Sequence, residues 1–169
     1  MKAWQFSTEA YAKSDRLAAW HNALAKLTMV SSNLREDEFY GIISAVASPM
    51  GIEFARITST PQSITGLGKK EPEGIWVALV IEGRVSVRDG AREVNALPGD
   101  ILYGAMGHAV GSQSILTLLT DGRLIMVKIP RSAFNPRLLA PLPTNVIHLP
   151  GRAGIGYVLA GFLNSVSDA

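Results

Sequence analysis

The chain has 169 residues, of which 47% are hydrophobic and 18% are charged, and its formal net charge is +2. This length favours a single domain with a substantial core, and the composition excludes a disordered chain. The basic side chains form no block, which argues against a nucleic-acid-binding surface on residues 1–169. Because the chain has no cysteine, disulfides and thiolate metal sites are excluded, and we expect a cytoplasmic protein.

No targeting or membrane segment is predicted. Residues 1–8 contain Lys2, Gln5 and Ser7 where a secretory leader needs an apolar run. The longest apolar runs have the length of a strand, well short of the ~20 residues that cross a bilayer. We therefore expect neither a leader nor a membrane span.

Residues 1–38 are expected to form an arm and a helix. Trp4, Phe6 and Tyr11 lie in a polar segment, which is typical of an arm that docks its aromatic side chains, with a frayed end as the alternative. Ser14-Asp15 then offers a helix cap. Beyond it, apolar side chains recur at helical spacing at Leu17, Trp20, Leu24 and Leu27.

Residues 39–130 are expected to form a β-barrel. Phe39–Ser48 and Ile52–Thr60 are predicted strands, joined as a hairpin around Pro49-Met50-Gly51. The following segment, Pro61–Gly74, is rich in Gly and Lys and is interpreted as a polar loop.

The stretch Ile75–Tyr103 carries the clearest β pattern. An apolar run is followed by valines that alternate with polar residues, which predicts two strands with a tight turn at Glu82-Gly83. Asp89-Gly90 predicts a two-residue hairpin, and Leu97-Pro98-Gly99-Asp100 predicts a sharp corner before the next strand. Short antiparallel strands with such corners build sandwiches and barrels.

The rest of the chain is expected to add a last pair of strands and a helix. Gln113–Thr120 and Leu124–Ile129 predict a hairpin across Asp121-Gly122. Residues 131–169 form the predicted C-terminal helical segment, in which an apolar face packs on the barrel, pairs with a second copy, or does both. We predict a dimer interface at Ile155, Leu159, Phe162, Leu163 and Val166, with Val158 on the same face.

Catalytic and metal-binding motifs are missing from the sequence. His21, His108 and His148 have no metal-ligand spacing, and Arg84–Arg88 places arginine and valine where a metal-binding cupin has His-x-His. No Gly-x-Ser-x-Gly elbow is present. We therefore predict no metal, no cofactor and no enzymatic activity.

The barrel interior is the expected binding site, because closed β-domains bury ligands among apolar and aromatic side chains with a few polar anchors. The candidate residues are the larger side chains of the strands and one histidine, with ordinary core packing as the alternative for each aromatic: Trp76, Phe54, Arg56, Tyr103 and His108. Strand alternation groups Trp76 with Ala78 and Val80 but does not decide which side faces inward.

Several pieces of the chain follow one another in a recognisable order. They are the helix with Trp20, the strand 51–59 followed by Thr60-Pro61-Gln62, the segments Leu79–Gly83 and Leu97–Asp100, the exit Ile129-Pro130-Arg131, and the closing helix that starts Gly154-Ile155-Gly156. Together they resemble the N-terminal regulatory domain of AraC-type transcription regulators, over nearly the whole chain.

The resemblance implies a cupin-like, jelly-roll barrel that binds a small organic effector and a helical contact that forms a homodimer. In that family a separate C-terminal domain with two helix-turn-helix units binds DNA. No such region follows Ala169, so DNA is expected as a partner only through a domain outside this chain. The chain departs from many relatives at Ser63–Gly66, where they carry a basic residue. A cupin-type enzyme, with or without metal, and a dimerisation scaffold without ligand are the alternatives.

Overall fold

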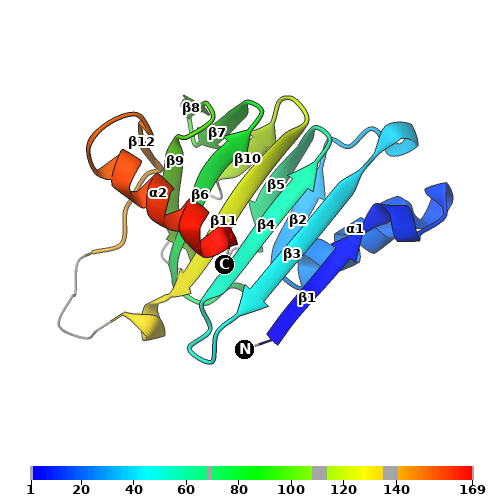
Figure 1. The fold of residues 1–169 in the computed structure, drawn as a ribbon, viewed down its shortest axis with the longest axis horizontal. Helices are drawn as coiled ribbons and strands as arrows, with labels where there is room; N and C mark the ends of the chain where they lie inside the picture. The colour runs from blue at the N-terminus through cyan, green and yellow to red at the C-terminus, as the bar shows by residue number, and fades with distance from the viewer. Residues whose placement is uncertain (1, 68–69, 108–113, 135–140, 169) are drawn as a thin grey trace.

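A computed structural model describes residues 2–67, 70–107, 114–134 and 141–168. Within these residues the chain forms two antiparallel sheets that pack face to face (Figure 1). The larger sheet has the strand order β1 (Lys2–Ser7), β3 (Gly41–Ala47), β4 (Glu53–Ser59), β11 (Gly122–Pro130), β6 (Gly74–Glu82), β9 (Ile101–Met106), β12 (Ile147–Leu149). The smaller sheet has the order β2 (Met29–Ser32), β5 (Gln62–Gly66), β10 (Ile115–Leu118), β7 (Val85–Asp89), β8 (Arg92–Ala96).

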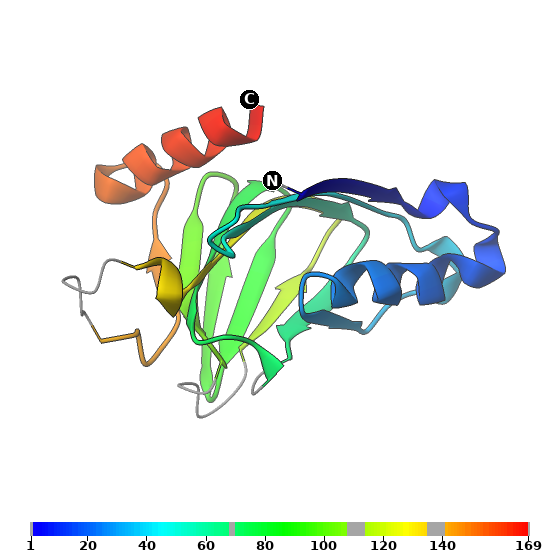
Figure 2. The ribbon, with the colours of Figure 1, turned by 90° about the horizontal axis from the view of Figure 1, so that it is seen from below.

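Two α-helices flank the sheets, α1 (Arg16–Ala25) and α2 (Gly154–Asp168). Figure 2 shows α2 over the outer face of the larger sheet and α1 at the other end of the molecule. Short 3₁₀ turns lie at Thr8–Ala10, Lys13–Asp15, Glu36–Glu38 and Arg131–Ala133. This arrangement confirms the predicted fold class in being mainly β, with two antiparallel sheets, an N-terminal helix and a C-terminal helix.

Side chains alternate between the two faces of the larger sheet, and β11 illustrates the consequence. Leu124 and Met126 belong to the core between the sheets, whereas Ile125 and Val127 belong to a second cluster that includes residues of α2. By the same alternation, Lys128 lies on the inner face. One strand therefore touches both the interior and the C-terminal helix.

The N-terminal arm is a strand, so the prediction of a docked arm is confirmed. β1 pairs with β3, and both Trp4 and Phe6 pack against the core. In α1, Trp20 is fully buried beside Phe39, as the helical spacing predicted. The predicted side-chain cap is wrong, because Asp15 occupies the cap position without bonding the first turn.

The predicted hairpin at Asp121-Gly122 is wrong. β10 pairs with β5 and β7 in the smaller sheet, whereas β11 pairs with β4 and β6 in the larger one. The turn after Glu82 likewise carries the chain between sheets. The two corners lie against each other: a Cβ on Gly83 would stand 2.5 Å from the Asp121 carbonyl oxygen and 2.9 Å from the Gly122 Cα. This long-range contact, and not the local dipeptide, determines the path.

The segment Pro61–Gly74 is not the predicted loop throughout, because it contains β5. Gln62 and Ser63 in this strand are buried with their side chains hydrogen-bonded, which is why a polar sequence can form an inner strand. The Gln62 side chain accepts from Trp20 Nε1 at 2.9 Å and donates to Ser59 Oγ at 2.6 Å.

Candidate functional site

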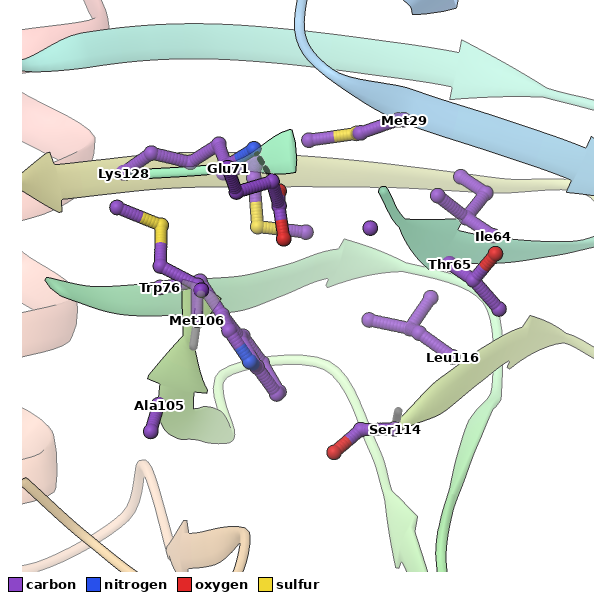
Figure 3. Close-up of a pocket in the computed structure, with 13 residues that line it drawn as sticks. Met29, Ile64, Thr65, Glu71, Trp76, Ala105, Met106, Ser114, Leu116 and Lys128 are labelled. Carbon is purple, nitrogen blue, oxygen red and sulfur yellow. Dashed lines mark hydrogen bonds and ion pairs between the residues drawn. The ribbon is translucent and has the colours of Figure 1, made fainter. Parts of the chain in front are cut away.

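A cavity lies between the two sheets, near the start of β6 and the end of β9 (Figure 3). The space open to the centre of a water molecule is about 70 Å³. Apolar side chains from both sheets line most of it: Met29, Ile64, Trp76, Met106, Leu116 and Met126. The polar side chains on its wall are Thr65, Glu71, Ser114 and Lys128. Such a mostly apolar hollow with a few converging polar groups is typical of small-molecule sites.

An ion pair between Lys128 and Glu71 forms the polar wall of the cavity. The ammonium nitrogen lies 2.5 Å from Glu71 Oε1, and the two side chains are only 7% and 5% exposed. Charges so deeply buried are tolerated only when they are paired and hydrogen-bonded. Lys128 also donates to the Leu27 carbonyl oxygen at 2.9 Å and to Thr28 Oγ1 at 2.5 Å. The ammonium thus has three acceptors.

Thr28 connects this network to the end of α1. Its backbone φ is 53°, a left-handed conformation that is rare for a β-branched residue. The hydroxyl is 2.7 Å from the Leu27 carbonyl oxygen and 3.3 Å from Glu71 Oε1. Uncommon backbone geometry that is held by a buried polar network is a frequent property of binding sites.

A second carboxylate, Glu53, adds negative charge beside the pair. It lies opposite Lys128 in the register of β4 and β11. Burial raises the pKa of Glu53 above its ordinary value; Lys128 opposes this effect, and the nearby Glu71 carboxylate adds to it. The ion pair on the cavity wall therefore has a second acidic group beside it, Glu53, which does not itself line the described wall.

Among the predicted ligand-binding residues, Trp76 lies on the cavity wall. Its ring packs over Gly104, which is opposite in the strand pairing, and a Cβ there would be 3.1 Å from the indole. Phe54 and Arg56 lie on the other face of the larger sheet, and alternation places Tyr103 there too. The structure therefore does not bring these three together with Trp76. His108 is outside the described residues.

Sequence reasoning missed both members of the ion pair. Lys128 does interrupt the apolar run of β11 on the same side as Leu124 and Met126, and that alternation was an available signal for an inward-facing charge. No local pattern could have identified Glu71, because its partner is 57 residues away.

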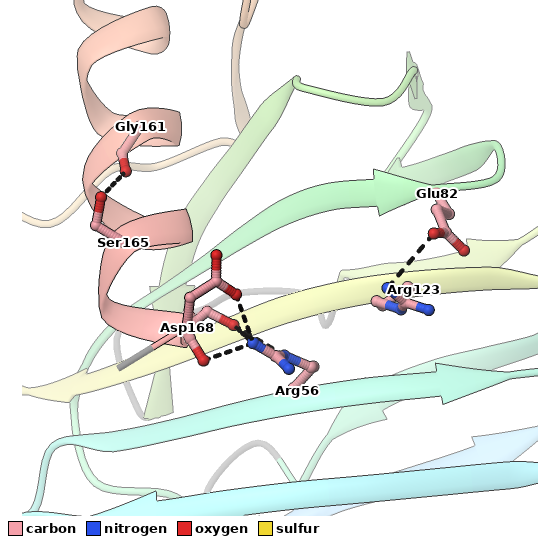
Figure 4. A network of polar contacts seen from close by, with 7 residues as sticks. Arg56, Glu82, Arg123, Gly161, Ser165 and Asp168 are labelled. Carbon is pink, nitrogen blue, oxygen red and sulfur yellow. Dashed lines mark hydrogen bonds and ion pairs between the residues drawn. The ribbon is translucent and has the colours of Figure 1, made fainter.

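Arg56 attaches the C-terminal end of α2 to the outer face of the sheet (Figure 4). Its guanidinium donates to the hydroxyl and the carbonyl oxygen of Ser167, and it lies 3.3 Å from the Asp168 carboxylate. A cation at the end of a helix also interacts favourably with the helix dipole. β4 thus carries Glu53 opposite Lys128 and Arg56 beneath the helix.

The larger sheet covers only one part of the predicted apolar face of α2. Leu163 is buried and Leu159 packs partly against the outer cluster, together with the small residues Gly156 and Ala160. The other members of the face are exposed by 44–62%: Ile155, Val158, Phe162 and Val166. The described residues therefore leave one apolar stripe of the helix uncovered.

Asp100 holds the segment that leads into α2. Its carboxylate accepts from the Leu97 N–H at 3.1 Å and the Gly151 N–H at 3.0 Å, and it lies 3.0 Å from His148 Nε2. Burial alone raises the pKa of Asp100, but the two N–H groups and His148 lower it below its ordinary value.

The described residues hold no group of three or more His, Asp or Glu side chains that could bind a metal ion. In the same residues no helix is long and apolar enough to cross a membrane. Within its described wall, the cavity offers apolar side chains and one charged pair.

No protein-family model and no curated protein sequence matches the chain. Among solved structures, the AraC-like transcriptional activator CuxR is similar over 99% of this chain and 60% of its own, with a TM-score of 0.72 and 15% identity. This chain shares its fold with part of that AraC-like activator. It spans only 60% of that activator's length.

Two cupins align over shorter parts of the chain. A cupin superfamily protein from Desulfitobacterium hafniense covers 59% of this chain and 84% of its own, at 12% identity and a TM-score of 0.43. An RmlC-like cupin from Desulfovibrio desulfuricans covers 59% and 89%, at 17% identity and a TM-score of 0.43.

Proposed function

We propose that residues 1–169 form one ligand-sensing and dimerisation domain of an AraC-type transcription regulator in the cytoplasm. The domain binds a small organic effector in the cavity between the sheets and passes the signal to α2. DNA binding is assigned to a helix-turn-helix domain outside these residues, and no catalytic role is assigned to the chain.

The observation that carries this proposal is the position of the Lys128–Glu71 pair. Lys128 lies on the inner face of β11, and its neighbour Val127 lies on the outer face in the cluster beneath α2. An effector that moves the ammonium therefore acts on a strand that supports the helix. Signalling further requires that the effector bind two arrangements of α2 with different affinity.

The experiment is native mass spectrometry of the chain with a panel of small molecules, which reports bound mass and association state together. Hydrogen exchange of the α2 amides, with and without a bound compound, then measures the response of the helix. We expect one ligand per chain and a changed exchange rate in α2.

A matched pair of variants locates the binding site. Ser114→Trp places a large ring at a half-buried position on the cavity wall and should abolish binding. Ser14→Trp, at an exposed position far from the cavity, should leave binding unchanged. Binding that survives Ser114→Trp would place the ligand elsewhere, and stoichiometric metal with turnover would favour the cupin-type enzyme. A folded dimer that binds nothing would favour the scaffold.

A further inference from the structure

The cationic group on the described wall of the cavity has no donor left for a ligand. Lys128 directs its ammonium at the Leu27 carbonyl oxygen, at Thr28 Oγ1 and at Glu71 Oε1. An ammonium has three N–H donors, and here each has an acceptor. A carboxylate or phosphate entering the cavity would meet a saturated lysine and would have to displace one of these buried bonds.

Unlike the Lys128 ammonium, the Glu71 carboxylate does not use all of its polar atoms in this network. The contacts with Lys128 and Thr28 both involve Oε1. Figure 3 shows the other oxygen directed away from the lysine. This oxygen, Oε2, lies next to Gly66 on the cavity wall, where a Cβ would collide with it. A carboxylate oxygen is acceptor-only, so this wall favours a ligand that donates a hydrogen bond.

The charged groups near the cavity wall also favour a positively charged ligand. Two acids lie close to the single ammonium of Lys128: Glu71 on the cavity wall, and Glu53 opposite Lys128 in the pairing of β4 and β11. The Glu71 carboxylate on the wall would attract an additional positive charge and repel an additional negative charge.

The remaining wall favours a compact apolar body. Trp76, Met106 and Met126 present an indole and two thioethers, which are polarisable groups that adapt to irregular ligands, and an indole face attracts cations. The cavity of about 70 Å³ is smaller than the ~150 Å³ apolar cavity that holds benzene in an engineered protein. The matching body is therefore a short aliphatic chain.

We propose that the effector of this domain is a small aliphatic amine, bound with its ammonium at Glu71 and its carbon chain against Trp76 and the methionines. This inference rests on the proposed function and names the chemical class that the cavity takes. Hydroxyl compounds of the same shape bind more weakly, because they donate a hydrogen bond without a charge.

Three probes with one branched carbon skeleton separate the classes: isobutylammonium, isobutanol and isobutyrate. Each is titrated at pH 7 into the ¹⁵N-labelled wild-type chain, and the indole N–H resonance of Trp76 is followed by NMR. We expect isobutylammonium to bind at least about tenfold more tightly than isobutyrate, with isobutanol between them. The comparison needs no substitution and so does not depend on a variant folding.

Variants then test the role of the acid. Glu71→Gln should bring the affinities of isobutylammonium and isobutanol together, while Glu9→Gln at an exposed site should leave the preference intact. Where Glu71→Gln alone does not fold, the double variant Glu71→Gln with Lys128→Met removes both buried charges and should give the same loss of preference.

The outcomes separate this inference from the proposed function. If isobutyrate binds as tightly as the amine, the amine class is overturned while the cavity remains a ligand site. If the preference for the amine is unchanged in both Glu71 variants, recognition by this carboxylate is overturned. If none of the three probes shifts the Trp76 resonance at 20-millimolar concentrations, on the order of the weakest affinity expected for ligands of five or six heavy atoms, the inference and the proposed cavity fail together.

Discussion

The Lys128 ammonium is held by acceptors from two separate parts of the chain, the turn after α1 and the segment before β6. Removing both charges of a buried pair is often neutral for stability, but removing one leaves a buried charge without a partner. The pair is therefore better explained by a requirement for a charged wall in the cavity than by a requirement for stability. The burial of each charge nevertheless depends on the presence of the other charge.

Lys128→Met tests this dependence. The variant leaves Glu71 buried without its cation, so the free energy of unfolding should fall by about 3–5 kcal/mol. Adding Glu71→Met removes the uncompensated charge and should recover most of the loss. Urea unfolding measures both, with Lys13→Met at an exposed lysine as the control. A double variant no more stable than Lys128→Met would show that the two charges do not depend on each other.

At the scale of elements, α2 has two neighbouring apolar faces with different roles. Gly156, Ala160 and Leu163 are buried against the larger sheet. The stripe formed by Ile155, Val158, Phe162 and Val166 remains exposed. Residues at this spacing line up along one side of a helix, and a second copy of the same helix can cover them. The stripe is our proposed dimer contact.

Phe162→Glu should disrupt that contact. A charge in the centre of the stripe cannot be buried against a second helix, so we expect monomers where the wild type forms dimers. Because Phe162 is 62% exposed, the melting temperature of the monomer should change little. Sedimentation measures the association state, and Asn164→Glu, exposed on the opposite side of α2, is the matched control. A variant that stays dimeric at wild-type strength would exclude this stripe as the interface.

The elements also show what the sequence could predict. Val85 and Val87 alternate with polar residues within β7, so a local pattern was enough to predict the strand. The corner at Gly122 was misread as a hairpin because its partner, Gly83, lies far away in sequence. Alternation also left the direction of Trp76 open, since both faces of β6 are apolar and both are covered.

At the scale of the whole molecule, the corner before β9 is a junction between parts of the chain that are distant in sequence. Asp100 bonds Leu97 after the smaller sheet, His148 in β12 and Gly151 before α2, so one carboxylate joins three parts of the fold. The approach is close, because a Cβ on Gly151 would collide with the Gly99 carbonyl group. The segment that leads into α2 is therefore tied to the corner before β9.

Asp100→Asn should weaken this junction in a way that depends on pH. The folded-state pKa of Asp100 lies below its ordinary value of 3.8, so the carboxylate stabilises the fold above pH 3.8, and this contribution disappears as the pH falls through the folded value. At pH 7 the variant should lose about 1–3 kcal/mol, because an amide replaces a charged acceptor of two N–H groups.

The difference in stability between wild type and Asp100→Asn should therefore narrow as the pH falls below 3.8. Urea unfolding at a series of pH values measures it, and Asp37→Asn at an exposed site corrects for general acid effects. Hydrogen exchange at Gly151 in the variant should rise together with that of the first turn of α2, since one carboxylate restrains both. A difference that does not narrow at all as the pH falls below 3.8 would mean that the side chain acts by its shape and not by its charge.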